Sequence, residues 1–335
     1  MKRIGNLYYK ICTLANLELA DEKARKGKLR SHGVRKHDKN RTENIKNLRE
    51  TLLNGTFRTS KYDVFTIYEP KAREIYRLPY YPDRIVHHAV MNVLEPIWTS
   101  IFTADTYSCI KNRGIHAAAK KVLAALRKDP ENTTYCLKID IRKFYPSIDH
   151  DVLKGIIRRK LKDKRLLALL DEIIDSADGV PIGNYLSQYF ANLILTYFDH
   201  WIKEEKGVKY YFRYADDIVV LAPDKAYLHS LLNEIRQYMS ELKLQVKDNW
   251  QVFPVASRGI DFLGYVFFHT HTRMRKGIKQ RLCKRIGKLN KRKTLTEEEF
   301  KRNVCSWWGW AKYCDSKHLI KKLSKSTKYE IKFKR

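Results

Sequence analysis

The sequence predicts an α+β fold, and three observations support this class. Short runs of aromatic and β-branched residues have the length and composition of strands, at 135–141, 210–222 and 260–268. A further short strand is expected around 244–246. Longer segments carry apolar residues at helical spacing, at 83–97, 185–201 and 225–242. From Arg273 onward the chain reads as helical and basic. No internal repeat organises these segments, and 335 residues leave room for about two or three subdomains.

The charge balance indicates a polyanionic partner. Lys and Arg number 67 against 37 Asp and Glu, a formal net charge of +30. Nucleic acid is the leading candidate, because its phosphates attract this charge directly. A membrane surface also attracts positive charge, but the chain has no run of about 18 apolar residues and no secretory signal. A cytoplasmic protein without a membrane partner is therefore expected.

The six cysteines are scattered without a Cys-x-x-Cys pair, so the sequence predicts neither a disulfide framework nor a zinc site. Cys305, Cys314 and His318 are conceivable zinc ligands, but their spacing is not a standard one.

Residues 1–45 are predicted to form a basic arm, helical over 4–24. The charged stretch that follows is predicted to be a loop, which either contacts phosphates or is merely solvated. A helix is expected over 42–53, and then two strands around a turn near Pro70.

Two aspartates and a proline are predicted to delimit helices. Asp83 is expected to cap a helix that Pro96 interrupts. An alanine-rich helix follows over 116–127. Asp149 is assigned as the N-cap of the helix that begins at Asp151, in preference to a role as a metal ligand.

Two adjacent acids, Asp216 and Asp217, interrupt the strongly β-favouring stretch 210–222. They fall at the reversal of a predicted hairpin, so both carboxylates would project from one rigid tip. A lone Asp-Asp pair is as readily explained by turn formation, because Asp bonds its own backbone in turns.

A third acid, Asp140, favours a chemical role. In the segment 135–141 apolar and polar residues alternate, so Asp140 faces away from the apolar side and can meet Asp216 from a neighbouring strand. Three crowded carboxylates repel one another unless divalent cations compensate them, and hard oxygen ligands suit Mg²⁺. The three acids therefore predict a two-metal phosphoryl-transfer site.

The C-terminal third combines a glycine-bearing strand with basic helices. Gly264 inside the predicted strand 260–268 is consistent with close approach of another chain. Residues 296–299 form a capping box. Trp307 and Trp308 can stack on nucleic acid, but a core position is favoured.

In chain order, these residues resemble the successive palm motifs of reverse transcriptases. The resemblance covers nearly the whole chain and includes the Tyr-Ala-Asp-Asp hairpin at 214–217 and Phe-Leu-Gly-Tyr at 262–265. Its most specific part is Ile-Gly-Asn-Tyr-Leu-Ser-Gln at 182–188, because most of these enzymes have Gln-Gly where this chain has Ile182-Gly183. This pattern is similar to the reverse transcriptases of diversity-generating retroelements, within the group II intron-like superfamily.

The resemblance implies a right-hand polymerase fold with four regions. These are a basic N-terminal arm (1–45), fingers (46–130), a palm (131–270, with a helical fingers/palm insertion at 150–205) and a basic helical thumb (271–335).

The resemblance also implies roles for individual residues. Asp140, Asp216 and Asp217 would be catalytic, and with the backbone carbonyl of Ile141 they would hold two Mg²⁺ ions, for which Mn²⁺ can substitute. The positions that match nucleotide-binding residues are Lys71, Arg73, Tyr145, Ile182 and Gly183. Tyr145 matches the steric gate against ribonucleotides, and Ile182 matches a position that affects fidelity. The primer grip would be Phe262, Leu263 and Gly264, and the nucleic-acid-binding thumb residues Lys279, Lys284, Arg285 and Lys288.

Two departures leave parts of the pattern unassigned. Ile110 stands where the wider family has a fingers arginine, and Trp250 stands where a general-acid lysine is expected. Lys247 is the nearest lysine to that position. No nuclease or integrase domain of ordinary size is expected after the thumb.

The resemblance implies RNA-directed synthesis of error-prone, adenine-mutagenised cDNA from a template-repeat RNA, for target-gene diversification by mutagenic retrohoming. The implied partners are template RNA, a DNA or RNA primer, dNTPs and a small basic accessory variability protein, in a bacterial or phage-encoded system. Alternatives are a group II intron or retron-type reverse transcriptase, an RNA-templated RNA polymerase that Tyr145 disfavours, and a catalytically silent RNA-binding scaffold that the three aspartates disfavour.

Overall fold

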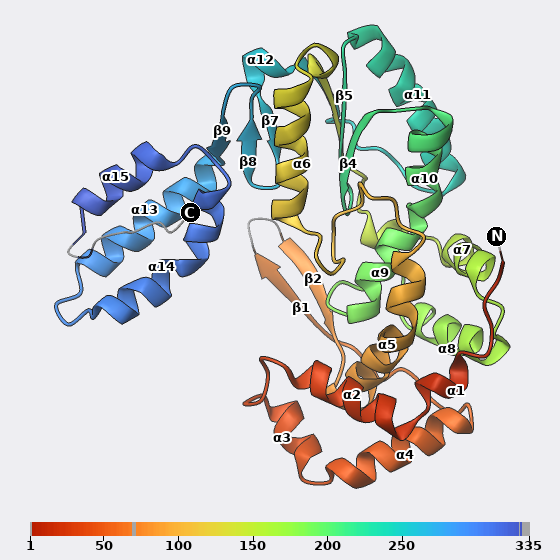
Figure 1. Cartoon of the computed structure of the whole chain (residues 1–335). Coiled ribbons are helices and arrows are strands. Elements are labelled where there is room, and N and C mark those ends of the chain that lie inside the picture. The colour runs from red at the N-terminus through yellow and green to blue at the C-terminus, as the bar shows by residue number, and fades with distance from the viewer. Residues whose placement is uncertain (1, 69–71, 328, 330–335) are drawn as a thin grey trace. The chain divides into compact units, whose positions relative to one another are not determined.

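The computed structural model describes residues 2–68, 72–327 and 329 (Figure 1). The chain forms two compact units. The first unit comprises Met1–Cys109, Ile141–Lys206 and Arg236–Val246, and the second comprises Ile110–Asp140, Gly207–Ile235 and Lys247–Arg335. Within the described ranges, none of the helices combines the length and the apolar character that a bilayer span requires.

The N-terminal part of the first unit is helical. Its elements are α1 (Tyr8–Ile11), α2 (Leu14–Arg25), α3 (His32–Asp38) and α4 (Arg41–Leu53). The single helix predicted over 4–24 is wrong, because Thr13 starts a new helix by accepting a hydrogen bond from the backbone N–H of Asn16. The charged stretch predicted as a loop contains α3. Its arginines are partly neutralised within the unit, since Asp21 is buried and pairs with Arg25 and Arg41 at 2.7 and 2.6 Å.

A two-stranded antiparallel hairpin and a buried helix follow. The elements are β1 (Asp63–Tyr68), β2 (Ala72–Arg77) and α5 (Ile85–Thr99), and they confirm the two strands predicted around Pro70. The predicted boundaries of the helix are wrong. Asp83 accepts a hydrogen bond from the Ser60 backbone N–H instead of capping α5, and Pro96 lies inside the helix. Burial of Trp98 beyond the proline offsets the hydrogen bond that Pro96 cannot make.

The rest of the first unit consists of helices. They are α7 (His150–Lys160), α8 (Lys164–Ile174), α9 (Tyr185–Ile194) and α10 (Thr196–His200). Asp149 caps α7 as predicted, because its side chain accepts a hydrogen bond from the Val152 N–H. The C-terminal end of α11 (Lys225–Glu241) also belongs to this unit.

A four-stranded antiparallel sheet forms the centre of the second unit, and we call it the catalytic sheet because it carries the three acids that are predicted to be catalytic. Its strands are β3 (Tyr135–Ile139), β4 (Tyr210–Tyr214), β5 (Asp217–Ala222) and β6 (Gln251–Pro254), in the order β4-β5-β3-β6. Helix α6 (Ile115–Lys128) contacts β4. The sequence did not predict β6. It predicted a strand at 244–246 instead, where the structure has only an isolated bridge between Val246 and Ile141.

A second, three-stranded sheet leads into three C-terminal helices, which we call the thumb helices because the resemblance predicts a thumb there. The strands are β7 (Ile260–Phe262), β8 (Tyr265–Phe267) and β9 (Thr272–Met274), preceded by α12 (Val255–Arg258). The single strand predicted over 260–268 is wrong. Phe262 pairs with Tyr265 across a two-residue turn in which Leu263 and Gly264 have φ of 55° and 83°. A left-handed turn of this kind reverses the chain, so the segment is a hairpin.

The thumb helices pack around a core of their own (Figure 1). They are α13 (Lys276–Asn290), α14 (Glu297–Lys312) and α15 (Lys317–Lys325). The predicted apolar face of α13 is buried, and the predicted capping box is present between Thr296 and Glu299. Trp307 and Trp308 pack against this core, in agreement with the prediction.

Candidate active site

The β4–β5 hairpin carries two of the three predicted catalytic acids. Tyr214 pairs with Asp217, so Ala215 and Asp216 form the reversal. Ala215 has a φ of 54°, a conformation that residues other than glycine rarely adopt. The buried Arg213 donates from Nη1 to the Ala215 carbonyl at 3.1 Å and so supports this turn. The tip that presents Asp216 is therefore rigid.

The register of the catalytic sheet brings Asp140 to the same place. Ile139 of β3 pairs with Ile218 of β5, so the next residues, Asp140 and Asp217, meet at the end of the ladder. Ile139 is buried and Asp140 is half-buried, which agrees with the predicted alternation. The three acids thus gather at one end of the sheet.

Crowding and burial change the acidity of these carboxyls. Burial, together with the hydrogen bond and the repulsion from Asp140, raises the pKa of Asp216 to about 7. Burial raises the pKa of Asp217 to about 6, against the opposing effect of the Lys138 ammonium. Without a counter-ion, Asp216 therefore keeps a proton near neutral pH.

Two lysines neutralise the site in part. Lys247 forms an ion pair with Asp140, and its backbone N–H donates to the Asp140 carbonyl at 2.8 Å. The Lys138 Nζ lies 3.6 Å from Asp217 Oδ1. Lys247 was the nearest candidate for the unassigned lysine, whereas Lys138 was not singled out. The sequence could have indicated Lys138, because a residue two positions before Asp140 on a strand lies on the same face of the sheet.

The carboxyl groups have the chemistry of a divalent cation site. Asp217 Oδ1 is buried and makes no hydrogen bond in the described structure, and a raised pKa indicates that positive charge would be favourable beside Asp216. These observations fit Mg²⁺, which prefers carboxylate oxygens. As the side chains lie, however, no three His, Cys, Asp or Glu residues within the described ranges form a ready metal shell. The predicted ligand set, including Ile141, stays a prediction.

The predicted primer-grip residues lie at the β7–β8 turn. Phe262 is fully buried, and the Gly264 carbonyl accepts a hydrogen bond from the Arg275 N–H at 2.9 Å. A Cβ on Gly264 would lie 2.7 Å from Ile278 and against the ring of Trp310. The segments that approach this glycine closely are therefore helices α13 and α14.

In the first unit, the segment before α9 is fastened at three points. The Val180 N–H donates to the Tyr145 carbonyl at 2.9 Å, and the Tyr76 N–H of β2 donates to the Ile182 carbonyl at 2.8 Å. His150 Nε2 lies 2.9 Å from the Gly179 carbonyl oxygen and provides the third contact, which the sequence did not predict. We call residues 179–183 the fastened loop.

Glycine is needed at both ends of the fastened loop. Gly179 has a φ of 59°, and a Cβ there would lie 2.5 Å from the Pro146 carbonyl oxygen. Gly183 has a φ of 121°, and a Cβ there would lie 2.9 Å from the Tyr76 carbonyl oxygen. Gly183 therefore allows the backbone of β2 to approach the fastened loop closely.

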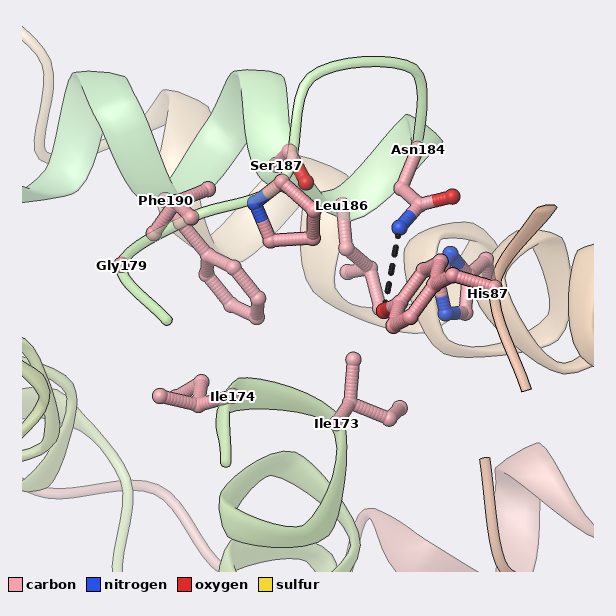
Figure 2. A pocket seen from close by; sticks show the side chains of 11 residues that line it. His87, Ile173, Ile174, Gly179, Asn184, Leu186, Ser187 and Phe190 are labelled. Carbon is pink, nitrogen blue, oxygen red and sulfur yellow. Dashed lines mark hydrogen bonds between the residues drawn. The ribbon is translucent and has the colours of Figure 1, made fainter. Parts of the chain in front are cut away.

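A small cavity of about 10 Å³ lies under the fastened loop (Figure 2). Asn184 and Ser187 line it, and the Asn184 amide donates to the Tyr62 hydroxyl at 3.3 Å. His87 reaches it from α5, and burial lowers the pKa of this histidine to about 3, so its ring is neutral. The buried Ser187 of the Ser-Gln pair therefore has a packing role.

The remaining predicted residues are distributed as follows. Arg73 is exposed on β2, Tyr145 is half-buried beside the buried Phe144, and Ile182 is half-buried. Lys71 lies outside the described residues. The thumb residues Lys279, Lys284 and Lys288 are exposed on α13, whereas Arg285 is half-buried and donates to the Asn303 side chain of α14.

Comparisons with known proteins identify the family and the fold of this chain. Residues 69–267 match the sequence profile of the family described as reverse transcriptase (RNA-dependent DNA polymerase). Protein YkfC of Escherichia coli K12 is 25% identical in an alignment over 274 residues, and the match covers 68% of this chain and 71% of YkfC. The retron Ec73 reverse transcriptase of Escherichia coli is 27% identical in an alignment over 245 residues, and the match covers 68% of this chain and 75% of the retron protein. The group II intron-encoded protein LtrA of Lactococcus lactis is 24% identical in an alignment over 177 residues, and the match covers 49% of this chain but only 29% of LtrA.

Among solved structures, apo telomerase from Candida tropicalis is similar with a TM-score of 0.52 at 12% identity. The match covers 82% of this chain and 60% of the telomerase chain, and at this identity it concerns the fold alone. The mixed helix and strand architecture is consistent with a right-hand polymerase fold. The chain belongs to the reverse transcriptase family, whose members are RNA-dependent DNA polymerases.

Proposed function

We propose that the protein copies a template-repeat RNA into adenine-mutagenised cDNA, as the polymerase of a diversity-generating retroelement. The observation that carries this proposal is the sequence and setting of the fastened loop. Ile182 replaces the glutamine found in most reverse transcriptases, and its half-buried side chain is not part of the core. The loop is followed by Gly-x-x-x-Ser-Gln, the pattern that resembles this subfamily.

The chemistry follows from the acids. Asp140, Asp216 and Asp217, with the carbonyl of the next residue Ile141, would hold two Mg²⁺ ions, which supply an activated primer hydroxyl and a stabilised leaving pyrophosphate. The β4–β5 hairpin carries two of these carboxylates and the end of β3 carries the third, and Lys138 and Lys247 neutralise them in part.

The setting of Ile182 supports a role in fidelity. The Tyr76–Ile182 hydrogen bond fixes the backbone, so the side chain presents only apolar bulk from a defined position. Discrimination by apolar contact alone is limited to about 1 to 3 kcal/mol, or about 10- to 200-fold. A glutamine at this position can hydrogen-bond a sugar or base edge and hold a correct pair in register. We expect the isoleucine to permit misincorporation. The preference for adenine rests on the resemblance and has no physical account in the structure.

Sequencing of cDNA made from one RNA template tests the proposal. Ile182→Gln should reduce misincorporation opposite template adenine, while total synthesis stays within about tenfold, because apolar contact is worth only this order of discrimination. Ile182→Leu is the matched control, since it keeps apolar bulk and should keep the error spectrum. Asp216→Asn should make no cDNA and yet retain the template RNA. An unaltered adenine error spectrum in Ile182→Gln contradicts the fidelity role.

The second candidate is a retron or group II intron-type reverse transcriptase. The similarity to the retron Ec73 reverse transcriptase and to LtrA favours it. The same sequencing experiment separates the two candidates. Errors concentrated at template adenines support the diversity-generating function, whereas accurate copying at adenine supports the alternative. Copurification with a small basic protein would support the accessory partner.

A further inference from the structure

Lys138 is a charged residue on the inner strand of the catalytic sheet. It lies on β3 opposite Val219 of β5 and Gln251 of β6. Side chains two residues apart on a strand point to one face, so Lys138 shares the face of Asp140. A lysine inside a sheet costs free energy unless its ammonium group finds partners, because charged groups are seldom buried without them.

The ammonium group of Lys138 has two partners on different elements. Its Nζ lies 3.6 Å from Asp217 Oδ1. It also donates a hydrogen bond to the backbone carbonyl oxygen of Asp261. The Lys138 and Asp217 side chains are only 24% and 32% exposed, so water screens this ion pair less than it screens one on the open surface.

Asp261 belongs to β7, and β7 is not part of the catalytic sheet. The Asp261 carboxylate accepts a hydrogen bond from Arg275 Nε at 2.6 Å, and the Arg275 backbone N–H donates to the Gly264 carbonyl at 2.9 Å. Arg275 thus connects β7 and the Leu263-Gly264 turn with the start of α13. Lys138 in turn connects β7, through the Asp261 carbonyl oxygen, with the Asp217 carboxylate at the start of β5.

We propose that Lys138 is a positioning residue that holds the Leu263-Gly264 turn at a set distance from the Asp217 carboxylate. The inference rests on the proposed polymerase function, in which this turn supports the primer end. A lysine suits the task because its ammonium group has three donors and can serve a carboxylate and a carbonyl at once. Misplacement of a reacting group by about 1 Å can cost about 100-fold in rate, so a loosened turn should slow the chemical step.

The structure offers a matched control for general loosening between the two sheets. His269, which follows β8, lies 3.1 Å through Nε2 from Thr133 Oγ1, just before β3. This contact also joins the two sheets, and it involves none of the three acids. His269→Ala removes it and leaves the Lys138 contacts in place. Lys209→Met is a second control, because it removes a lysine that pairs with Asp129 on the surface.

The first experiment measures kcat and KM for dATP in primer extension on an RNA template. Lys138→Met keeps the aliphatic stem and removes the ammonium group, and it should lower kcat by at least about tenfold with KM for dATP little changed. Lys138→Arg restores charge and donors and should recover most of kcat. His269→Ala and Lys209→Met should keep kcat. Thermal unfolding of each variant identifies any loss of kcat that comes from loss of the fold.

The second experiment measures primer placement without catalysis. A dideoxy-terminated primer with 2-aminopurine at its 3′ end is annealed to RNA and bound in the presence of a chelator. Lys138→Met and Asp217→Asn should change the fluorescence of the bound primer in the same direction, with affinity close to that of the wild type. The double variant should show no further change, because the two substitutions break the same pair.

Three results would overturn the role of Lys138. They are wild-type kcat and fluorescence in Lys138→Met, an equal loss of kcat in His269→Ala, and a double variant whose fluorescence change is the sum of the two single changes. Failure of the wild-type protein to extend any primer on RNA would instead overturn the proposed polymerase function. The two failures are therefore distinguishable.

Discussion

Without metal, the ionised Asp216 carboxylate should destabilise the folded protein, and Asp216→Asn should remove this effect. Burial and the neighbouring Asp140 raise the pKa of Asp216 from 3.8 to about 7. The unfolded chain releases this proton near pH 4, whereas the folded protein keeps it until about pH 7. Between these values the folded state binds more protons, so stability falls as pH rises and levels off above the folded pKa.

The size of the effect follows from the difference in pKa. A difference of about three units corresponds to at most about 4 kcal/mol, at 1.36 kcal/mol per unit. Partial exposure of Asp216 and its coupling to Asp140 reduce this value, and we expect about 1 to 3 kcal/mol. For a chain of this size, about 2 °C in Tm corresponds to 1 kcal/mol. Asp216→Asn should therefore raise Tm by about 2 to 6 °C at pH 8.5 and by less than about half as much at pH 5, where the stability of the wild type has fallen only part of the way.

Thermal unfolding in EDTA, followed at several pH values, measures this difference. The comparison between variant and wild type cancels the other groups that titrate over the same range. Adding Mg²⁺ should raise the Tm of the wild type at pH 8.5 and that of Asp216→Asn less, because a ligand of the folded state stabilises by mass action.

Asp129 supplies a control of opposite sign. Its hydrogen bonds from Lys209 and Tyr210 hold the pKa of this carboxyl well below its usual range. Asp129→Asn should therefore fail to raise Tm at any pH. Equal Tm for Asp216→Asn and the wild type at pH 8.5 in EDTA would refute the reasoning, and so would a difference that is the same at pH 5.

Three further predictions concern other parts of the site. Gly264→Ala should lower the free energy of unfolding by about 2 to 4 kcal/mol and weaken primer binding, because the alanine would have a positive φ and its Cβ would be pressed against α14. An unchanged Tm would show that the turn relaxes freely. Tyr145→Ala should admit ATP in competition with dATP, since truncation opens space for the 2′-hydroxyl; unchanged sugar choice would make Tyr145 a packing residue. The double variant Lys284→Ala with Lys288→Ala should make the plot of log binding constant against log salt concentration shallower, by about 0.7 for each lost phosphate contact. Arg285→Ala, which loses only a hydrogen bond to α14, should leave this slope unchanged.

The sequence predicted the elements in which local signals and tertiary structure agree. The β4–β5 hairpin was predictable because two strand-like runs flank a polar reversal, and the Asp149 cap and the Thr296 capping box were predictable because their side chains bond to nearby backbone. The alternation of apolar and polar residues around Asp140 correctly predicted that its side chain faces away from the buried side of β3.

Other elements were not predictable because their determinants are distant in sequence or unusual in conformation. The β7–β8 hairpin has Leu263 at positive φ, and nothing in its side chain signals this. β6 ends in Pro254 and exists because β3 offers a second edge for pairing. The contacts of Lys138 and His150 depend on how separate elements meet, at sequence separations of 123 and 29 residues.

The charge distribution around the three acids explains how the protein can fold before it meets a metal ion. Three ionised carboxylates at the end of one sheet would repel one another strongly. Lys247 neutralises Asp140, Lys138 opposes the charge of Asp217, and Asp216 holds a proton near neutral pH. The folded protein therefore carries about one unneutralised negative charge or none at the tip, although its three carboxyls stay in place. Since a divalent cation has only to displace one proton and the ammonium group of Lys247, the site can bind it without rearranging the sheet, and the backbone that positions the acids is set by folding alone.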